Sequence, residues 1–343
     1  MAHEHMADLL DLDAEVLSEY HREVAEWVSA NLTERARVID VGAGTGTGTL
    51  ALARQLPDAE VIALDVDEEM LKHIQDKARA SGLADRIRTV QADLDQAWPD
   101  GLKTADLVWA ANSLHHMGDP ARAVAQIYQM LRPGGLLAVT ELESFPRFLT
   151  DPAGAALEER IHTAMARGRD EAGMHIHEDW PARFAEAGFA VESERRFVIA
   201  LQPPPDSPMA ASVTRYAMVT LCRARHGLED KLSAGDIADL DALAPALSAR
   251  DDLTVRTSRT VWLARKPAGQ PGWPQDRGIT SCGEKHHGQL WLLEVPAVTS
   301  ATCARSSGPI TSGRSPASIM VSRGSRCRPY ANGGPARVLQ LVA

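Results

Sequence analysis

The chain has 343 residues, of which 44% are hydrophobic and only 5% are aromatic. This composition fits a folded enzyme with one large α/β domain or two domains, and the few aromatic residues do not suggest a stacking surface for single-stranded nucleic acid. Before Pro267 the chain carries 28 Lys and Arg against 43 Asp and Glu, a net charge of −15, which disfavours a phosphate backbone as partner.

The positions of the cysteines and the lengths of the apolar runs bear on disulfides, metal sites and membrane spans. Cys222 is the only cysteine before residue 267, so the sequence predicts neither a disulfide framework nor a cysteine metal site. The N-terminus MAHEHMADLLDLD is acidic where a secretory signal would be basic, and no apolar run reaches the length of a membrane span. We therefore expect a cytoplasmic protein without a metal, a nucleic-acid partner or a membrane partner, and the oligomeric state stays open.

The first expected element is an amphipathic helix over Leu12–Leu32, where apolar residues recur at helical spacing. Short apolar strands then alternate with helical stretches, which is typical of parallel βαβ units. The expected strands are Ala36–Val41, Glu60–Leu64, Ile87–Gln91, Ala105–Ala110 and Gly135–Leu142. This alternation predicts an α/β fold with helices on both faces of a mostly parallel sheet.

Helical patterns dominate after Ser144. The expected elements there are helices over Ala153–Arg169 and Glu178–Ala187, a strand over Phe189–Leu201, a helical insertion from Ser207 to about Ala246, and a final strand over Leu253–Lys266. Two helical insertions late in an α/β domain suggest a cap over the active site.

Beyond Pro267 the periodicity stops and Gly, Pro and Ser accumulate, which predicts a mostly disordered, low-complexity tail over residues 267–343. The loss of pattern after a complete strand also fits translation past the natural end of a domain, for example after a frameshift. The expected organisation is one domain over residues 1–266. It comprises an N-terminal helical cap (1–34), a cofactor-binding core (35–145), and cap insertions with the last strands (146–266).

A glycine-rich turn follows the first expected strand. The segment DVGAGTG places on or beside this turn the residues Asp40, Gly42, Ala43, Gly44 and Gly46. Glycine permits a tight turn and a close approach to a ligand, and N–H groups at a helix start favour a carboxylate or phosphate. Asp65 ends the next strand, where a carboxylate can accept hydrogen bonds from both ribose hydroxyls. Turn and acid together predict an adenosine-containing ligand; the alternative is that Asp65 caps the helix beginning near Glu68.

The spacing of the glycines indicates which kind of adenosine-containing ligand the turn suits. A dinucleotide fingerprint GxGxxG fails from Gly42 and from Gly44, because threonine stands in the third glycine position. The observed GxGxG, preceded by Asp40, suits a sulfonium amino acid better than a pyrophosphate. Asp40 is expected to help place the positively charged methionyl end, and the helix start to accept its carboxylate.

Five motifs lie within about Asp13–Lys266. They are DVGAGTG from Asp40, ALDVDEEML from Ala63, QADLD from Gln91, NSLHHMGDP from Asn112 and LRPGGLLAV from Leu131. On these motifs the chain resembles the class I S-adenosylmethionine-dependent methyltransferases, and within them the small-molecule group that includes the ubiquinone and menaquinone C-methyltransferases. The resemblance implies a Rossmann-like seven-stranded sheet with an antiparallel last strand. It also implies S-adenosylmethionine as cofactor and methyl transfer to an O, N or C atom of a small-molecule acceptor.

The resemblance further implies roles for residues at matching positions. The implied contacts are the ribose for Asp65, the adenine face for Val66, the adenine edge for Asp93 and the backbone of Leu94, and the methionine moiety for Ala111 and Asn112. In this family the LRPGG turn is structural.

Methyl transfer depends on alignment and exclusion of water more than on a catalytic triad. An acceptor that starts protonated would profit from a general base, for which His115 and His116 after the fourth strand are candidates; loop packing is the alternative. Glu141, at the end of the fifth strand, is expected to orient a substrate amine or hydroxyl, or else to be a solvated carboxylate.

Three residues are candidates for contact with the acceptor, namely Tyr20, His177 and Tyr216. The alternative for the two tyrosines is the hydrophobic core, since aromatic residues on amphipathic helices usually pack there. His175 and His177 alternate as a metal pair would, but no third ligand is evident and a loop ahead of the next helix explains them better.

Three rival functions remain on the sequence alone. An NAD(P)-dependent oxidoreductase shares the glycine turn and the ribose acid, but neither a second mononucleotide-binding half nor a Tyr/Lys pair is seen. An RNA methyltransferase is disfavoured by the acidic charge. A non-catalytic S-adenosylmethionine-binding protein stays open, because methyl transfer requires no fixed set of side chains.

Overall fold

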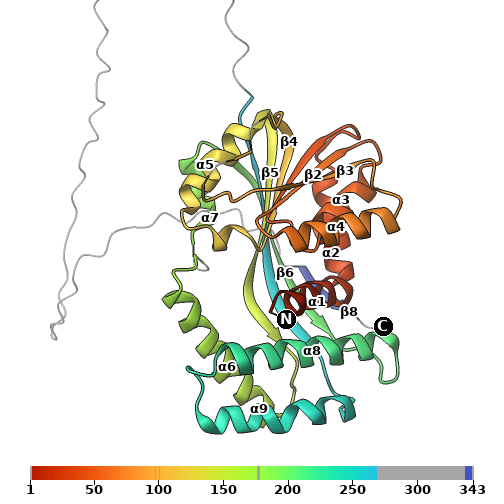
Figure 1. The fold of residues 1–343 in the computed structure, drawn as a ribbon, viewed down its shortest axis with the longest axis vertical. Helices are drawn as coiled ribbons and strands as arrows, with labels where there is room; N and C mark the ends of the chain where they lie inside the picture. Colours follow the sequence, from red (N-terminus) through yellow and green to blue (C-terminus); the bar gives the residue numbers. More distant parts are fainter. Residues whose placement is uncertain (1, 97, 100, 176–177, 269–336, 342–343) are drawn as a thin grey trace, which may run out of the picture. The chain divides into compact units, whose positions relative to one another are not determined.

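The computed structural model describes residues 2–96, 98–99, 101–175, 178–268 and 337–341, and its centre is one mixed sheet (Figure 1). The sheet order is β3-β2-β1-β4-β5-β7-β6-β8. The strands are β1 (Arg37–Val41), β2 (Glu60–Asp65), β3 (Ile87–Gln91), β4 (Ala105–Ala111), β5 (Leu131–Arg147), β6 (Ala190–Leu201), β7 (Val255–Arg265) and β8 (Arg337–Leu341). Strands β1 to β5 are parallel, and β7 is antiparallel to both β5 and β6. Strands β1 to β7 thus confirm the seven-stranded Rossmann-like sheet.

Strand β8 adds an eighth strand that the sequence did not predict. It lies parallel to β6, with Phe197 opposite Arg337 at one end of the pairing. The free edge of β6 would otherwise leave a row of backbone N–H and C=O groups unpaired, which is why such an edge accepts a further strand. Residues 337–341 therefore differ from the disorder expected for the tail. Residues 269–336 of that tail lie outside the described part.

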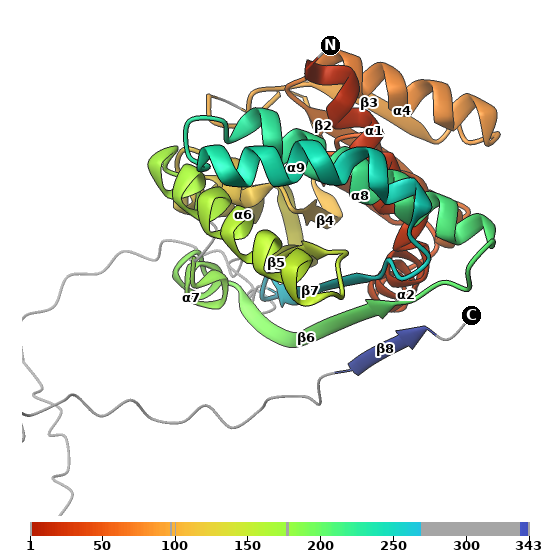
Figure 2. The same ribbon diagram turned by 90° about the horizontal axis from the view of Figure 1, so that it is seen from below.

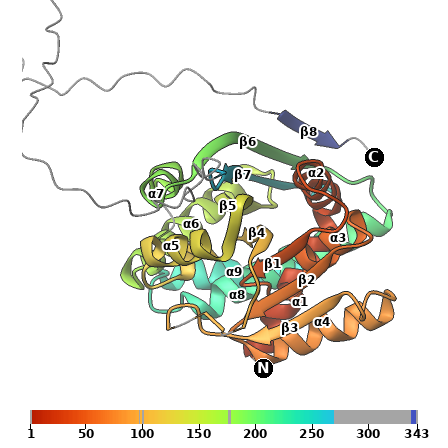
Figure 3. The same cartoon turned by 90° about the horizontal axis from the view of Figure 1, so that it is seen from above.

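Helices cover both faces of the sheet, as expected. They are α1 (Ala2–Val16), α2 (Ser18–Ser29), α3 (Thr47–Gln55), α4 (Glu68–Ala80), α5 (Pro120–Met130), α6 (Pro152–Glu171), α7 (Trp180–Glu186), α8 (Pro208–Gly227) and α9 (Ala234–Ala246). Figure 3 shows α5 and α7 on one side of the sheet and α2 and α3 on the other. Neighbouring residues of β4 show the same division: Leu107 joins the core beside α2 and α3, and Val108 the core beside α5 and α7. Side chains of a strand alternate between its faces, so both cores share the same strands.

Two predicted helical stretches are each divided in the structure. The helix expected over Leu12–Leu32 breaks at Leu17, whose φ of −99° and ψ of 26° are not helical, so that α1 and α2 meet there at an angle. The stretch from Ser207 to Ala246 forms α8 and α9, and α9 begins at a capping box made by Ser233 and Asp236. Apolar spacing alone did not show these breaks.

Helices α6, α8 and α9 lie together at the lower end of the view in Figure 1 and side by side in Figure 2. Helices α6 and α8 begin in the same way. The Asp151 side chain accepts the Gly154 N–H, the Ser207 side chain accepts the Ala210 N–H, and a proline follows each cap. Proline suits the first helical position because the N–H there needs no partner within the helix. No helix in the described ranges is both long and apolar enough to traverse a bilayer.

A partly buried cluster of polar side chains ties α1 and α2 to α8 and β7. Asp13 accepts hydrogen bonds from Arg259 at 2.5 Å and from the Tyr216 hydroxyl at 2.7 Å, and its carboxylate lies 3.3 Å from the His21 ring. Arg259 is only 2% exposed. Burial tends to raise the pKa of Asp13, but the charge of Arg259 outweighs it and holds that pKa well below its usual value. The N-terminal helix is therefore anchored by an ion pair inside the protein.

Replacing Arg259 with methionine should lower the free energy of unfolding by about 3 kcal/mol, because the Asp13 carboxylate would stay buried without its counter-charge. Urea unfolding followed by circular dichroism measures the change. The matched control is Arg22→Gln, which breaks the exposed Arg22–Glu26 pair on α2 and should leave the transition midpoint unchanged. Equal midpoints for the wild type and R259M would contradict the role given to the buried pair.

Candidate functional site

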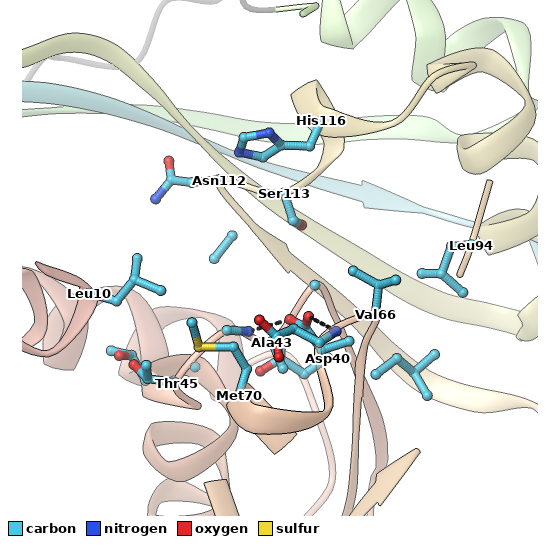
Figure 4. A pocket seen from close by; sticks show the side chains of 18 of the residues that line it. Leu10, Asp40, Ala43, Thr45, Val66, Met70, Leu94, Asn112, Ser113 and His116 are labelled. Carbon is cyan, nitrogen blue, oxygen red and sulfur yellow. Dashed lines mark hydrogen bonds between the residues drawn. The ribbon is translucent and has the colours of Figure 1, made fainter. Parts of the chain in front are cut away.

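A cavity of about 600 Å³ lies at the carboxyl ends of β1, β2 and β4, where the strand order reverses. Open α/β sheets bind ligands at this kind of position. In Figure 4, Asn112, Ser113 and His116 lie on the upper side of the cavity and Asp40 and Ala43 on the lower side. Helix α1 borders it as well, through Met6, Leu10 and Asp13.

The glycine turn forms the floor of the cavity with its backbone. Gly42, Gly44 and Gly46 have φ values of 64°, 53° and 83°, a region that disfavours other residues. A Cβ atom at Gly42 would lie 2.5 Å from the Cβ of Ser113, and one at Gly46 would lie 2.8 Å from Ile74. Both the backbone angles and the close neighbours therefore require glycine at Gly42 and Gly46.

Asp65 holds this turn from the neighbouring strand. Its Oδ2 accepts the Gly44 backbone N–H at 2.8 Å and its Oδ1 accepts the Asp67 N–H at 3.0 Å. The cap of α4 is Asp67, whose side chain accepts the Glu69 N–H at 2.8 Å. The alternative in which Asp65 caps that helix is wrong, and Asp65 instead lines the cavity.

Asp40 lies beneath the turn and is 2% exposed. It accepts a hydrogen bond of 2.6 Å from the Thr49 hydroxyl of α3. Burial raises the pKa of Asp40 to about 7, the Thr49 hydrogen bond opposes this rise, and the nearby Asp65 charge adds to it. A positive charge entering the cavity would favour the ionised form of Asp40.

Acidic side chains are the main charged groups of a cavity lining that is otherwise largely apolar. Six aspartates border it, namely Asp13, Asp40, Asp65, Asp67, Asp93 and Asp95. Among the described lining residues there is no Lys or Arg. Such a lining attracts a cation and repels a pyrophosphate, because the field inside a cleft adds the effects of all nearby charges.

The far walls of the cavity contain the other expected ligand contacts. Val66 is 62% exposed although it is apolar, and it borders the cavity with Asp93 and Leu94. Asn112 has a φ of 50°, and its Oδ1 is buried without a hydrogen-bond partner. An unpaired buried acceptor costs free energy, so a ligand N–H placed beside it would be stabilised. Ala111 lines the cavity too.

Of the residues expected to contact the cofactor, all but one border the cavity. The bordering ones are Asp40, Gly42, Ala43, Gly44, Asp65, Val66, Asp93, Leu94, Ala111 and Asn112. Gly46 lies outside the lining, and its close neighbour is Ile74 of α4. The structure thus collects residues from four separate motifs around one cavity.

His115 and Glu141 form a buried pair. The His115 Nδ1 lies 2.5 Å from the Glu141 Oε2, and each residue is 5% exposed. Glu141 is therefore not the solvated carboxylate of the alternative interpretation. No described residue forms a hydrogen bond with the other ring nitrogen, the His115 Nε2.

His116 borders the cavity, whereas His115 and Glu141 do not. The ring centroids of the two histidines are 4.2 Å apart. Burial, together with positive charge on Arg169 and on His115 when that ring is protonated, lowers the pKa of His116 to about 4. His116 is therefore neutral and a weak base near pH 7.

Two of the three expected acceptor contacts, Tyr20 and Tyr216, do not border the cavity. Tyr20 and Tyr216 are each 2% exposed and belong to the core around Asp13, where the Tyr20 hydroxyl lies 2.7 Å from the Thr140 hydroxyl. Their core alternative is the correct one, because both hydroxyls find partners inside the protein. His177 lies outside the described residues. The backbone N–H of His175 donates to the His115 carbonyl at 3.0 Å.

Sequence reasoning missed several residues that border the cavity. Trp109 does so, and its indole N–H is buried without a partner. Its position, two residues before Ala111 on β4, was a usable signal, because residues two apart share a face of a strand. Leu10, Asp13 and His21 also border the cavity. They had no comparable signal, since their placement depends on the break between α1 and α2.

Comparison with known proteins gives a consistent result. Residues 38–135 match the family model described as Methyltransferase domain. The chain is 29% identical over 186 residues to 27-O-demethylrifamycin SV methyltransferase of Amycolatopsis mediterranei (strain S699), covering 53% of this chain and 65% of that protein. It is 36% identical over 112 residues to demethylmenaquinone methyltransferase of Thermus thermophilus, covering 32% of this chain and 49% of that protein. The chain thus spans less than two thirds of the length of these relatives.

Among solved structures, the chain is similar to the crystal structure of the [4+2]-cyclase SpnF. The sequence identity is 23%, the TM-score is 0.45, and the match covers 72% of this chain and 82% of that chain.

Proposed function

We propose that this chain, which belongs to the class I S-adenosylmethionine-dependent methyltransferases, transfers a methyl group from S-adenosylmethionine to a small-molecule acceptor. Small-molecule acceptors are also named for the relatives, such as a demethylrifamycin and a demethylmenaquinone. The acidic charge of the chain supports an acceptor other than a nucleic acid.

One observation carries the proposal: a glycine turn held by Asp65 forms the floor of a cavity whose lining is rich in carboxylates. S-adenosylmethionine bears a sulfonium, an ammonium and one carboxylate, so its net charge is positive. A dinucleotide brings a pyrophosphate to the same turn, where Asp40 and Asp65 would face it without a Lys or Arg among the described lining residues. The charge of the cavity therefore favours the methyl donor over NAD(P).

The residues present fit that cofactor. Asp65 is suited to the ribose hydroxyls, and the exposed Val66 to the adenine face. Asp93 and the backbone of Leu94 are suited to the adenine edge. The unpartnered Oδ1 of Asn112 is available to an ammonium group. When bound, S-adenosylmethionine supplies a methyl group already activated by its sulfonium.

We also propose that the His115–Glu141 pair accepts a proton from the acceptor. The Glu141 carboxylate beside Nδ1 favours the tautomer in which Nδ1 carries the proton, which leaves the Nε2 lone pair as the base. His116 contacts the His115 ring and borders the cavity, so its neutral ring is suited to contact the acceptor. In this proposal the N-terminal segment (1–34) and the insertions within 146–266 enclose the acceptor.

Replacing Asp65 with alanine should weaken the binding of S-adenosylhomocysteine at least tenfold, because hydrogen bonds to a charged group are lost. Isothermal titration calorimetry measures this, with Asp76→Ala on the exposed face of α4 as a charge-matched control that should bind like the wild type. NADH titrated into the wild type should give no binding heat. If the folded wild type binds NADH but not S-adenosylhomocysteine, the proposed function is wrong.

The affinity of the wild type for S-adenosylhomocysteine should fall as the pH is lowered through about 7. Asp40 is protonated below that pH in the free protein, and the ligand ammonium lowers the pKa of Asp40 in the complex, so binding at pH 6 must release a proton. The expected loss approaches roughly tenfold per pH unit below 7, and proton release follows from calorimetry in buffers of different ionisation enthalpy. Asp40→Asn should remove the dependence between pH 8 and pH 6. An unchanged wild-type affinity between pH 8 and pH 6 would contradict the role given to Asp40.

The tautomer of His115 tests the proposed base. In ¹⁵N-labelled protein at pH 7.5, His115 should show a protonated Nδ1 and an unprotonated Nε2, and Glu141→Gln should abolish this preference because a neutral amide no longer fixes the tautomer. His226, whose Nδ1 faces the Cys222 carbonyl at 2.7 Å on the exposed side of α8, should keep its signals in the same variant. A proton on Nε2 of His115 in the wild type would exclude it as the base.

A further inference from the structure

Arg169 lies in the last turn of α6. Its guanidinium carbon is 4.1 Å from the centre of the Phe145 ring, at the end of β5. Together with Phe145 and Ala166 it borders a small hollow of about 50 Å³. The guanidinium therefore lies with one face on an aromatic ring, and such stacking leaves the N–H groups at its edge free.

The edge of this guanidinium lacks a partner. No described carboxylate forms an ion pair with Arg169, and no described residue accepts a hydrogen bond from it. Its nitrogens are not among the buried unpartnered atoms, so they remain open to solvent. Burial nevertheless lowers the pKa of Arg169 to about 10, with Glu141 opposing the shift, and the side chain stays charged at neutral pH. A partly desolvated cation with open donors is suited to an anion.

Electrostatic interactions connect Arg169 with the proposed chemistry. Its charge acts on Glu141, the partner of His115, and on His116 at the edge of the cofactor cavity. Two other carboxylates border the hollow. Glu143 is already paired with Arg196 at 2.5 Å, and Asp170 is exposed, where water screens its charge.

We propose that Arg169 and Phe145 bind a planar carboxylate group of the methyl acceptor, which thereby places the acceptor against the His115–Glu141 pair. This assignment rests on the proposed function, and it narrows the acceptor to an acidic molecule, best an aromatic or conjugated carboxylic acid. The guanidinium edge would donate two parallel hydrogen bonds to the carboxylate, and Phe145 would fix the plane of the guanidinium.

Benzoate is the probe, titrated into the full chain saturated with S-adenosylhomocysteine and followed by ligand-observed NMR and calorimetry. The wild type should bind benzoate and not benzamide, which has the same shape without the charge. Arg169→Gln should weaken benzoate at least tenfold, and Arg169→Lys should weaken it less, because lysine keeps the charge but not the planar pair of donors. Arg167→Gln is the matched control, since Arg167 is exposed on the same helix, and it should bind like the wild type.

Each outcome decides the assignment. Binding of S-adenosylhomocysteine is measured first on every sample: its absence in the wild type overturns the proposed function, and its presence in R169Q shows that this variant is folded. With S-adenosylhomocysteine bound, a wild type that does not bind benzoate overturns the assignment of Arg169 alone. So does equal benzoate affinity in the wild type and R169Q, or an equal loss in R167Q. If R169Q does not fold, R169K against R167Q gives the same comparison.

Discussion

The hydrogen bond from the Gly44 backbone N–H to the Asp65 carboxylate is the interaction on which the site depends. It joins the turn after β1 to the end of β2, and the Ala43 N–H reinforces the junction by donating to the Leu64 carbonyl at 3.0 Å. The turn can approach Asp65 only because its glycines adopt positive φ values. The same carboxylate therefore shapes the floor of the cavity and faces the space where a ribose would lie.

The second constraint is the negative charge of the aspartates near the cavity, some of which are paired with a cation and some of which are not. Asp13 is neutralised by Arg259, and Asp11 by Lys77, so the N-terminal helix can border the cavity without adding unpaired charge. Asp40 is left without a cation in the described structure, and burial keeps its pKa near neutrality. A cationic ligand supplies the missing charge. The charge of Arg169, on α6, acts on His116 at the edge of this cavity.

Much of the nucleotide-binding half follows from local sequence. A turn that needs glycine, a strand that ends in an acid and a strand followed by Asn112 are each encoded within a few residues, and parallel strands bring their ends to one edge. The helices near the acceptor were harder to anticipate. Tyr20 and Tyr216 stand on amphipathic helices, where spacing alone leaves open whether an aromatic residue contacts the acceptor or the core. Both are buried, and Asp13 and Thr140 supply partners for their hydroxyls. For Glu141 the sequence left open whether the carboxylate orients a substrate or is solvated. Its burial is explained only by the position of His115, which follows a different strand.

By itself, the sequence determined the alternation of strands and helices, the glycine turn, the acid that ends the second strand and the excess of negative charge. These depend on spacing along the chain and on residue type, which local physics can interpret. The tertiary structure decided where α1 breaks, which carboxylates are neutralised, and that Arg169 lies open beside Phe145 and near Glu141. Such features depend on contacts between residues far apart in sequence, because burial and ion pairing arise only when separate elements pack together.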